Sequence, residues 1–180
     1  TKQTWQFGNL SVRFAVVNEN YSLVVKGDLT IESGKFTVTN VYGIGVTGKL
    51  TVKGGEFQSE GINDYLIGNW GETVIEGGSF SGQYCCVNNF AGTTEITGGD
   101  FTTEAFDYTG DYESSDLLAD SGMTVTGGTF SKDVTEYCAD GYHTVYSAND
   151  GAYVYGAHSH SAVVTAPTCT DAGYTTYTCS

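Results

Sequence analysis

Leu50-Thr-Val-Lys-Gly-Gly-Glu-Phe57 is a stretch that this chain repeats, with variation, at 29–36, 73–80, 94–101 and 123–130. The phenylalanines that close the five copies are separated by 21, 23, 21 and 29 residues. A period of about twenty residues, built from short β-type segments, is typical of a solenoid. Each unit is too small to bury its own apolar face, so it must stack on its neighbours.

The repeat has the residue pattern of a coil made of short strands. The fifth residue before each Phe is apolar in every copy: Ile31, Val52, Ile75, Ile96 and Val125. Side chains alternate along a strand, so this position and the one two residues earlier share a face. A Gly-Gly or Ser-Gly pair then supplies a sharp turn, and the Phe points inward from the next strand. The pattern predicts an all-β, right-handed parallel β-helix of about six rungs, with caps at both ends and a small C-terminal appendage.

Stacking in register also predicts contacts between charges on the outer surface. Glu32, Lys53 and Glu76 occupy the same repeat position in successive copies, and Lys35 and Glu56 share another position. Neighbouring strands lie about 4.8 Å apart, so unlike charges would face each other across the rungs. Exposed pairs of this kind contribute about 0–1 kcal/mol each, so they specify register more than they stabilise.

The chain divides into three parts on this reading. Residues 1–28 form an N-terminal cap and a degenerate first rung, in which Leu10-Ser-Val12 takes the place of Leu29-Thr-Ile31. Residues 29–156 form the β-helix and its C-terminal cap, which includes a hairpin turning at 149–151. Residues 157–180 form a separate small module with the single Pro, two of the three His and two of the five Cys.

Composition narrows the classes of function. The 180-residue chain has a formal net charge of −14, and only Lys132 among its basic residues lies after residue 53. Such a surface repels phosphate backbones, which argues against nucleic-acid binding. No segment approaches eighteen continuous apolar residues, so no membrane insertion is expected. The chain begins at Thr1 without a signal peptide, and we expect it to be a mature or excised piece of something larger.

Aromatic residues gather on the variable arms that follow each Phe. The candidate ligand-binding residues are Tyr65, Trp70, Tyr84, Tyr108 and Tyr112, with Phe90 beside them. Aromatic rings on exposed arms can stack on sugar rings, and loops on a rigid scaffold are where function usually resides. The alternative is that these residues only cover the corners of the coil. Both readings stay open at this point.

The longest arm also carries a cluster of acidic residues. Asp107, Asp111, Glu113 and Asp116 are hard oxygen ligands at short spacing, as Ca²⁺ prefers. Their spacing differs from that of the EF-hand loop and of calcium-binding β-rolls. The alternatives are therefore a calcium site and a solvated acidic loop, and no other cofactor is expected.

The cysteines fall into two groups. Cys85 is expected to be buried as a small apolar residue, and the adjacent Cys86 to face outward. In the tail, a Cys169–Cys179 disulfide is expected if the protein is secreted. A zinc site formed by His158, His160, Cys169 and Cys179 is the alternative, although the tail lacks the usual Cys-x-x-Cys spacing.

Two stretches carry a resemblance to known proteins. Gly127-Gly-Thr-Phe-Ser-Lys-Asp-Val-Thr-Glu-Tyr-Cys-Ala-Asp-Gly-Tyr142 resembles the end of β-helix segments in large cell-surface proteins of Gram-positive gut bacteria. The tail, Ala162-Val-Val-Thr-Ala-Pro-Thr-Cys-Thr-Asp-Ala-Gly-Tyr-Thr-Thr-Tyr-Thr-Cys-Ser180, is similar to short Cys-containing repeats that follow in them, where a further Cys-Gly pair comes next. The resemblance implies an extracellular or cell-wall-associated setting. It brings no catalytic residues with it.

Three functions are compatible with the sequence. The first is a non-catalytic surface module, a stalk or adhesin that displays loops to a glycan or host protein. The second is a polysaccharide hydrolase or lyase, for which a carboxylate pair such as Asp100 with Asp107 would be needed. The absence of Lys and Arg between residues 54 and 131 argues against a lyase. The third is self-association into fibres through the ends of the solenoid.

Overall fold

The computed structural model describes residues 11–13, 21–38, 42–59, 65–104, 114–157, 160–170 and 172–179. Its strands form four sheets, which we call A to D. Sheet A has the order β1-β4-β7-β10-β13-β16-β18-β17 and consists of Ser11–Arg13, Lys35–Val38, Glu56–Ser59, Ser79–Gly82, Asp100–Thr103, Thr129–Phe130, Ala152–Ala157 and Tyr142–Ser147.

Sheets B and C complete the coil, and sheet D lies in the tail. Sheet B runs β2-β5-β8-β11-β14 and consists of Tyr21–Val25, Tyr42–Val46, Ile67–Asn69, Cys85–Asn89 and Ser115–Ala119. Sheet C runs β3-β6-β9-β12-β15 and consists of Asp28–Ile31, Lys49–Val52, Glu72–Ile75, Thr93–Ile96 and Met123–Val125. Sheet D pairs β19 with β20, His160–Thr165 and Tyr174–Cys179.

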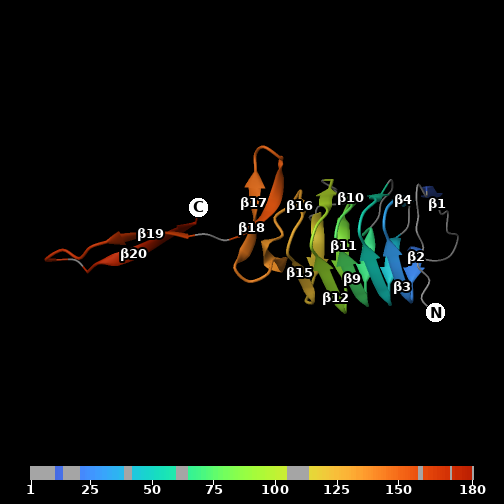
Figure 1. Ribbon diagram of the computed structural model, residues 1–180, viewed down its shortest axis with the longest axis horizontal. Helices are drawn as coiled ribbons and strands as arrows, with labels where there is room; N and C mark the ends of the chain where they lie inside the picture. Colours follow the sequence, from blue (N-terminus) through green and yellow to red (C-terminus); the bar gives the residue numbers. More distant parts are fainter. Residues whose placement is uncertain are drawn as a thin grey trace.

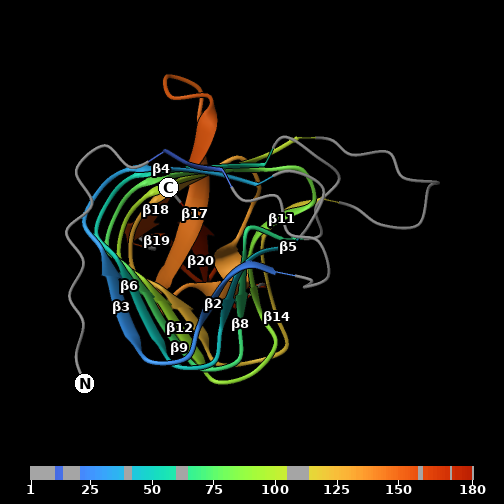
Figure 2. The same cartoon turned by 90° about the vertical axis from the view of Figure 1, so that its right-hand side faces the viewer.

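The parallel strands are stacked as a β-solenoid. Along the chain they come in successive triples, from β2-β3-β4 to β14-β15-β16, and each triple gives one strand to each of sheets B, C and A. The three sheets form three sides of the coil, as Figure 2 shows. Pairing within the coil is parallel throughout the described strands from β1 to β16. The predicted all-β parallel solenoid is therefore confirmed.

Two apolar columns run along the inside of the coil. The phenylalanines are paired from rung to rung as predicted, and Phe57, Phe80, Phe101 and Phe130 stack with ring centroids 4.7–5.1 Å apart. Ile and Val form the second column in sheet C, where the register pairs Val52 with Ile75 and Ile96 with Val125. Burial of these side chains, at about 1.5–3 kcal/mol each, supplies most of the stability.

Glycine is required at two points of each coil after the first. The second Gly of each Gly-Gly pair has a positive φ, for example 109° at Gly78, which favours glycine at the turn before the Phe strand. The glycine between sheets B and C lies against the coil below, and a Cβ at Gly71 would approach the carbonyl oxygen of Gly48 to 2.2 Å. Both requirements recur in successive coils, which explains the spacing of glycine in the sequence.

The outer surface carries two of the predicted charge pairs. The Nζ of Lys35 lies 2.6 Å from a carboxylate oxygen of Glu56, and Lys53 lies 3.0 Å from Glu32. A third pair, between Lys49 and Glu72, joins β6 to β9 and was not predicted. All six side chains are exposed, so the pairs mark the register without contributing much to the free energy of folding.

The first described strand corrects one prediction. Leu10-Ser-Val12 was expected to occupy the place of Leu29-Thr-Ile31, but Ser11–Arg13 instead pairs with β4, which sets Val12 beside Phe36. Alternation of apolar and polar residues alone fits a strand in any of the three sheets. The Gly-Gly turn that identifies the register in the later copies is missing from this segment. The sequence therefore could not show which of the three sheets the strand joins.

A short cap follows the last coil at the C-terminal end of the solenoid. The 3₁₀ helix η1, Thr135–Tyr137, follows β16, and the antiparallel hairpin β17–β18 continues sheet A beyond β16. The hairpin turns at 148–151, where the Gly151 amide donates to the Ser147 carbonyl. In Figure 1 sheet D extends away from this cap, and its strands pair only with each other. Among the described residues, no helix is long and apolar enough to cross a membrane.

Candidate functional site

Four aromatic side chains gather over sheet B, two from the beginning of its strands and two from the turn into sheet C. Tyr42 stacks on Tyr65 with ring centroids 4.9 Å apart, and Trp70 stacks on Phe90 at 4.5 Å. Tyr65 joins the two pairs, because its ring meets those of Trp70 and Phe90 nearly edge-on at 6.5 and 5.1 Å. We call this cluster the aromatic face. It extends over three successive coils.

The backbone under the aromatic face explains why the rings converge. A Cβ at Gly68 would lie 2.5 Å from the Tyr65 ring and 3.1 Å from the Trp70 ring, so both rings rest over this glycine. Parallel pairing of β5 with β8 places Ile44 beside Ile67, and the same register brings Tyr42 beside Tyr65. A side chain at position 68 would therefore separate the rings.

A buried polar network fixes the turn that carries the exposed pair. Asn69 and Asn89 directly precede Trp70 and Phe90, and the Asn69 amide donates to Asn89 Oδ1 over 2.8 Å. Asn89 donates in turn to the Ser121 carbonyl over 2.7 Å, while Thr94 donates to Asn89 Oδ1 over 2.9 Å. Because these side chains are satisfied and buried, the turns of neighbouring coils are held in register.

The aromatic face presents two exposed rings on a buried support. Trp70 is 38 % exposed and Phe90 is 45 % exposed, whereas Tyr65 beneath them is 6 % exposed. Exposed aromatic pairs that are mounted on a rigid sheet offer apolar surface at a low cost in conformational entropy. The stacked pair therefore leaves apolar ring surface exposed to solvent.

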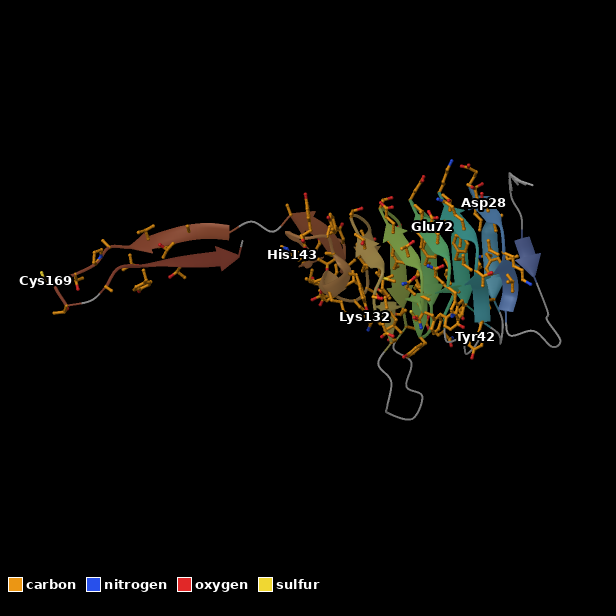
Figure 3. All side chains as sticks on the ribbon, turned by 90° about the horizontal axis from the view of Figure 1, so that it is seen from below. Asp28, Tyr42, Glu72, Lys132, His143 and Cys169 are labelled. Carbon is orange, nitrogen blue, oxygen red and sulfur yellow. The ribbon has the colours of Figure 1, made fainter. Side chains whose placement is uncertain are left out.

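An open depression of about 420 Å³ lies beyond the turn, on sheet C. It is lined by Glu72, Thr73, Val74, Thr93, Thr94, Glu95, Gly122 and Thr124. Glu72 also accepts a hydrogen bond from Lys49, which raises the pKa of the Lys49 ammonium. In Figure 3 Glu72 and Tyr42 project on opposite sides of the solenoid, with the turn between them.

The structure brings together part of the predicted ligand-binding set. Tyr65 and Trp70 are in contact, with Phe90 beside them. Tyr84 is half-buried in the turn before β11, where its carbonyl oxygen accepts a hydrogen bond from the Ser115 amide. Tyr108 and Tyr112 lie outside the described residues. Ligand binding by this set stays a prediction.

The acidic cluster is described only at Asp116. This residue is fully buried in β14, and its carboxylate accepts hydrogen bonds from Thr103 Oγ1, Ser131 Oγ and the Lys132 amide, each 2.8 Å long. These contacts join the last coil to the cap, so Asp116 has a structural role. Among the described residues, no three His, Cys, Asp or Glu side chains are placed to hold a metal ion. Asp107, Asp111 and Glu113 lie outside the described part of the chain.

The tail holds its two cysteines far apart. Cys169 lies in the connection between β19 and β20 as an exposed free thiol, while Cys179 pairs with His160 at the other end of the hairpin. Five residue steps from Thr165 to His160 correspond to about 17 Å at 3.3–3.4 Å per residue. The predicted disulfide is therefore not formed in this structure. The same separation is too large for Cys169 and His160 to bind one zinc ion. His158 is outside the described residues.

Cys85 and Cys86 are both buried, which corrects the prediction that Cys86 faces outward. The Cys86 Sγ lies 3.6 Å from the Phe80 carbonyl oxygen and 3.4 Å from that of Thr102, at the inner corner between sheets A and B. The chain turns this corner just before β11, so the alternation of inner and outer positions is broken there. Burial raises the pKa of both thiols, so they are poor nucleophiles.

Searches of protein-family models, curated proteins and solved structures found no significant match to this chain. Sequence reasoning missed Tyr42 and the depression. Tyr42 falls six residues after Phe36 and Tyr65 eight residues after Phe57, so the arm lengths hid their common register.

Proposed function

We propose that this chain is a non-catalytic extracellular surface module that binds glycans through the aromatic face. The observation that carries the proposal is the stacked, exposed pair Trp70 and Phe90, supported from below by Tyr65. A pyranose ring has an apolar surface of C–H groups, which packs on an aromatic ring, and a rim of hydroxyl groups. Exposed aromatic surface beside carboxylates and hydroxyls matches both parts of such a ligand.

The wider setting belongs to the same proposal. The solenoid would be a right-handed coil of about six rungs, acting as a rigid stalk that holds the aromatic face away from a surface. The resemblance to Gram-positive cell-surface proteins supports an extracellular or cell-wall-associated location, with a glycan or a host surface protein as partner. A calcium ion ordering the acidic arm around Asp107, Asp111 and Glu113 remains part of the proposal.

The enzymatic alternative has less support. Asp100, which the sequence offered as half of a carboxylate pair, accepts a hydrogen bond from Thr129 on the surface of sheet A. Its suggested partner, Asp107, lies outside the described residues. We therefore expect neither hydrolysis nor β-elimination of common polysaccharides.

Self-association is a second candidate, favoured by the composition of the C-terminal strands. The strands β17, β18, β19 and β20 contain no Asp, Glu, Lys or Arg, in a chain of net charge −14. In the described part of sheet A, β17 is the outermost strand, and it exposes Tyr142, Val145 and Tyr146. An uncharged, apolar edge strand is a common route to pairing between chains. Sedimentation of the protein with and without Val145→Lys tests this candidate, since the lysine should abolish any association.

A glycan and mucin array, probed with and without a chelator, tests the main proposal. We expect binding that is lost in the double variant Trp70→Ala, Phe90→Ala and kept in Tyr174→Ala. Tyr174 is a matched control, because it is also exposed but lies on sheet D. Binding that survives the double variant would show that the aromatic face is not the site. Turnover of a polysaccharide that is lost in Asp100→Asn would show that the chain is an enzyme.

A further inference from the structure

The depression on sheet C lies at the same level along the solenoid as the exposed aromatic pair. Trp70 is separated from Glu72 by one residue, and Phe90 from Thr93 by two. Gly122 and Thr124, on the opposite side of the depression, belong to the next coil. The depression therefore spans the coils that carry Trp70 and Phe90 and the one after them, directly around the turn.

The lining of the depression has the chemistry of a hydrogen-bonding surface for hydroxyl groups. Glu72, Thr93, Glu95 and Thr124 are exposed there, and Val74 between them is partly buried. Strand alternation directs these five side chains outward, whereas Thr73 and Thr94 turn into the coil. Carboxylate oxygens accept hydrogen bonds from sugar hydroxyls, and threonine hydroxyls can both donate and accept.

The charge of the lining is negative and is only partly compensated. Lys49 pairs with Glu72 from the neighbouring coil, but the residues that line the depression include no Lys or Arg. Glu95 pairs across the strands with Val74 and Thr124, which are both uncharged. A ligand carboxylate or sulfate placed here would meet like charge well within the Debye length of about 8 Å at physiological ionic strength.

We infer that the depression is a second subsite for the same glycan and that it selects neutral hexose units over uronic-acid or sulfated ones. One sugar ring packs on the Trp70–Phe90 pair, and the adjoining unit lies in the depression with its hydroxyls donating to Glu95 and Glu72. This inference rests on the proposed glycan binding and adds the class of glycan.

Affinity for matched pairs of hexasaccharides tests the inference. The probes are β-1,4-mannan and β-1,4-mannuronan, β-1,4-glucan and β-1,4-glucuronan, and α-1,4-galactan and α-1,4-galacturonan, each measured by calorimetry. For at least one pair we expect the neutral member to bind and its uronate to bind at least tenfold more weakly. Equal affinity within each pair would overturn the inference while leaving the proposed function intact. If neither member of any pair binds, while the array shows glycan binding that depends on Trp70 and Phe90, the inference fails and the proposed function stands.

A charge variant separates the two conclusions further. Glu95→Gln keeps a hydrogen-bond acceptor and removes one negative charge. The affinity for the neutral hexasaccharide should therefore stay within fivefold of the unmodified protein's. The affinity for the uronate should rise about threefold, as expected for the loss of one charge several ångströms away in water. Glu104→Gln removes the same charge from the exposed residue that follows β13 in sheet A, on another side of the coil from the depression, and should change neither value. An unchanged ratio in Glu95→Gln, or an equal change in Glu104→Gln, would overturn the inference. Loss of all binding in the double variant Trp70→Ala, Phe90→Ala would support the proposed function and would leave the choice between neutral and acidic sugars untouched.

Discussion

Replacing Phe80 by alanine should remove a central member of the inner phenylalanine stack. Phe80 is 1 % exposed, and its ring lies 4.8 Å from that of Phe57 and 4.7 Å from that of Phe101. Loss of its burial costs about 1.5–3 kcal/mol, and loss of two ring contacts costs about 0.5–1.5 kcal/mol each. The sum agrees with the roughly 3–5 kcal/mol that buried Phe→Ala changes cost in general.

Thermal and urea unfolding measure this loss. For a chain of this length, each kcal/mol corresponds to about 2–4 °C, so the melting temperature should fall by roughly 6–20 °C. The control is Phe90→Ala, which removes the same atoms from a ring that is 45 % exposed and should cost only about 1 kcal/mol. Phe80→Leu should recover much of the lost stability, because it refills most of the volume. Equal destabilisation by Phe80→Ala and Phe90→Ala would refute the stacked-core reasoning.

Four further outcomes are expected. Deleting 158–180 should leave the cooperative unfolding of the solenoid unchanged, since sheet D pairs only within itself; loss of cooperativity would contradict this. Asp116→Ala should lower the free energy of unfolding in urea by about 3 kcal/mol, because three hydrogen-bond donors lose their acceptor. An unchanged free energy of unfolding would show that Asp116 does not join the last coil to the cap. Thr73→Val should raise the free energy of unfolding by about 1 kcal/mol, because the buried Thr73 hydroxyl has no hydrogen-bond partner. A lower free energy of unfolding would show that this hydroxyl does form a hydrogen bond. At pH 8 a thiol reagent should modify Cys169 at once and Cys86 only after unfolding, because Cys86 is buried and its raised pKa keeps the thiol protonated. Peptide mapping by mass spectrometry follows each cysteine separately, and rapid labelling at Cys86 in the folded protein would argue against its burial.

The candidate site was only partly predictable from the sequence. Trp70 and Phe90 stood out as aromatic residues on variable arms, and their positions relative to the glycine turn are comparable in successive repeats. Their contact with Tyr65 depends on Gly68, whose role is visible only when both rings are placed over it. The depression was not predictable at all, because it forms between outward side chains of three different coils.

The sequence by itself determined the repeating unit, the identity of the inner columns and the register of the coils. The reason is physical: a period-two strand, a glycine with positive φ and a buried Phe can be satisfied together by only one stacking of such units. Only the tertiary structure decided the features that depend on contacts between coils. It set Val12 beside Phe36, turned Cys86 inward at a corner, used Asp116 to join the last coil to its cap, and brought the aromatic rings together. Those features depend on which backbone turns lie next to each other in the folded chain. The residue spacing within a single repeat does not contain that information.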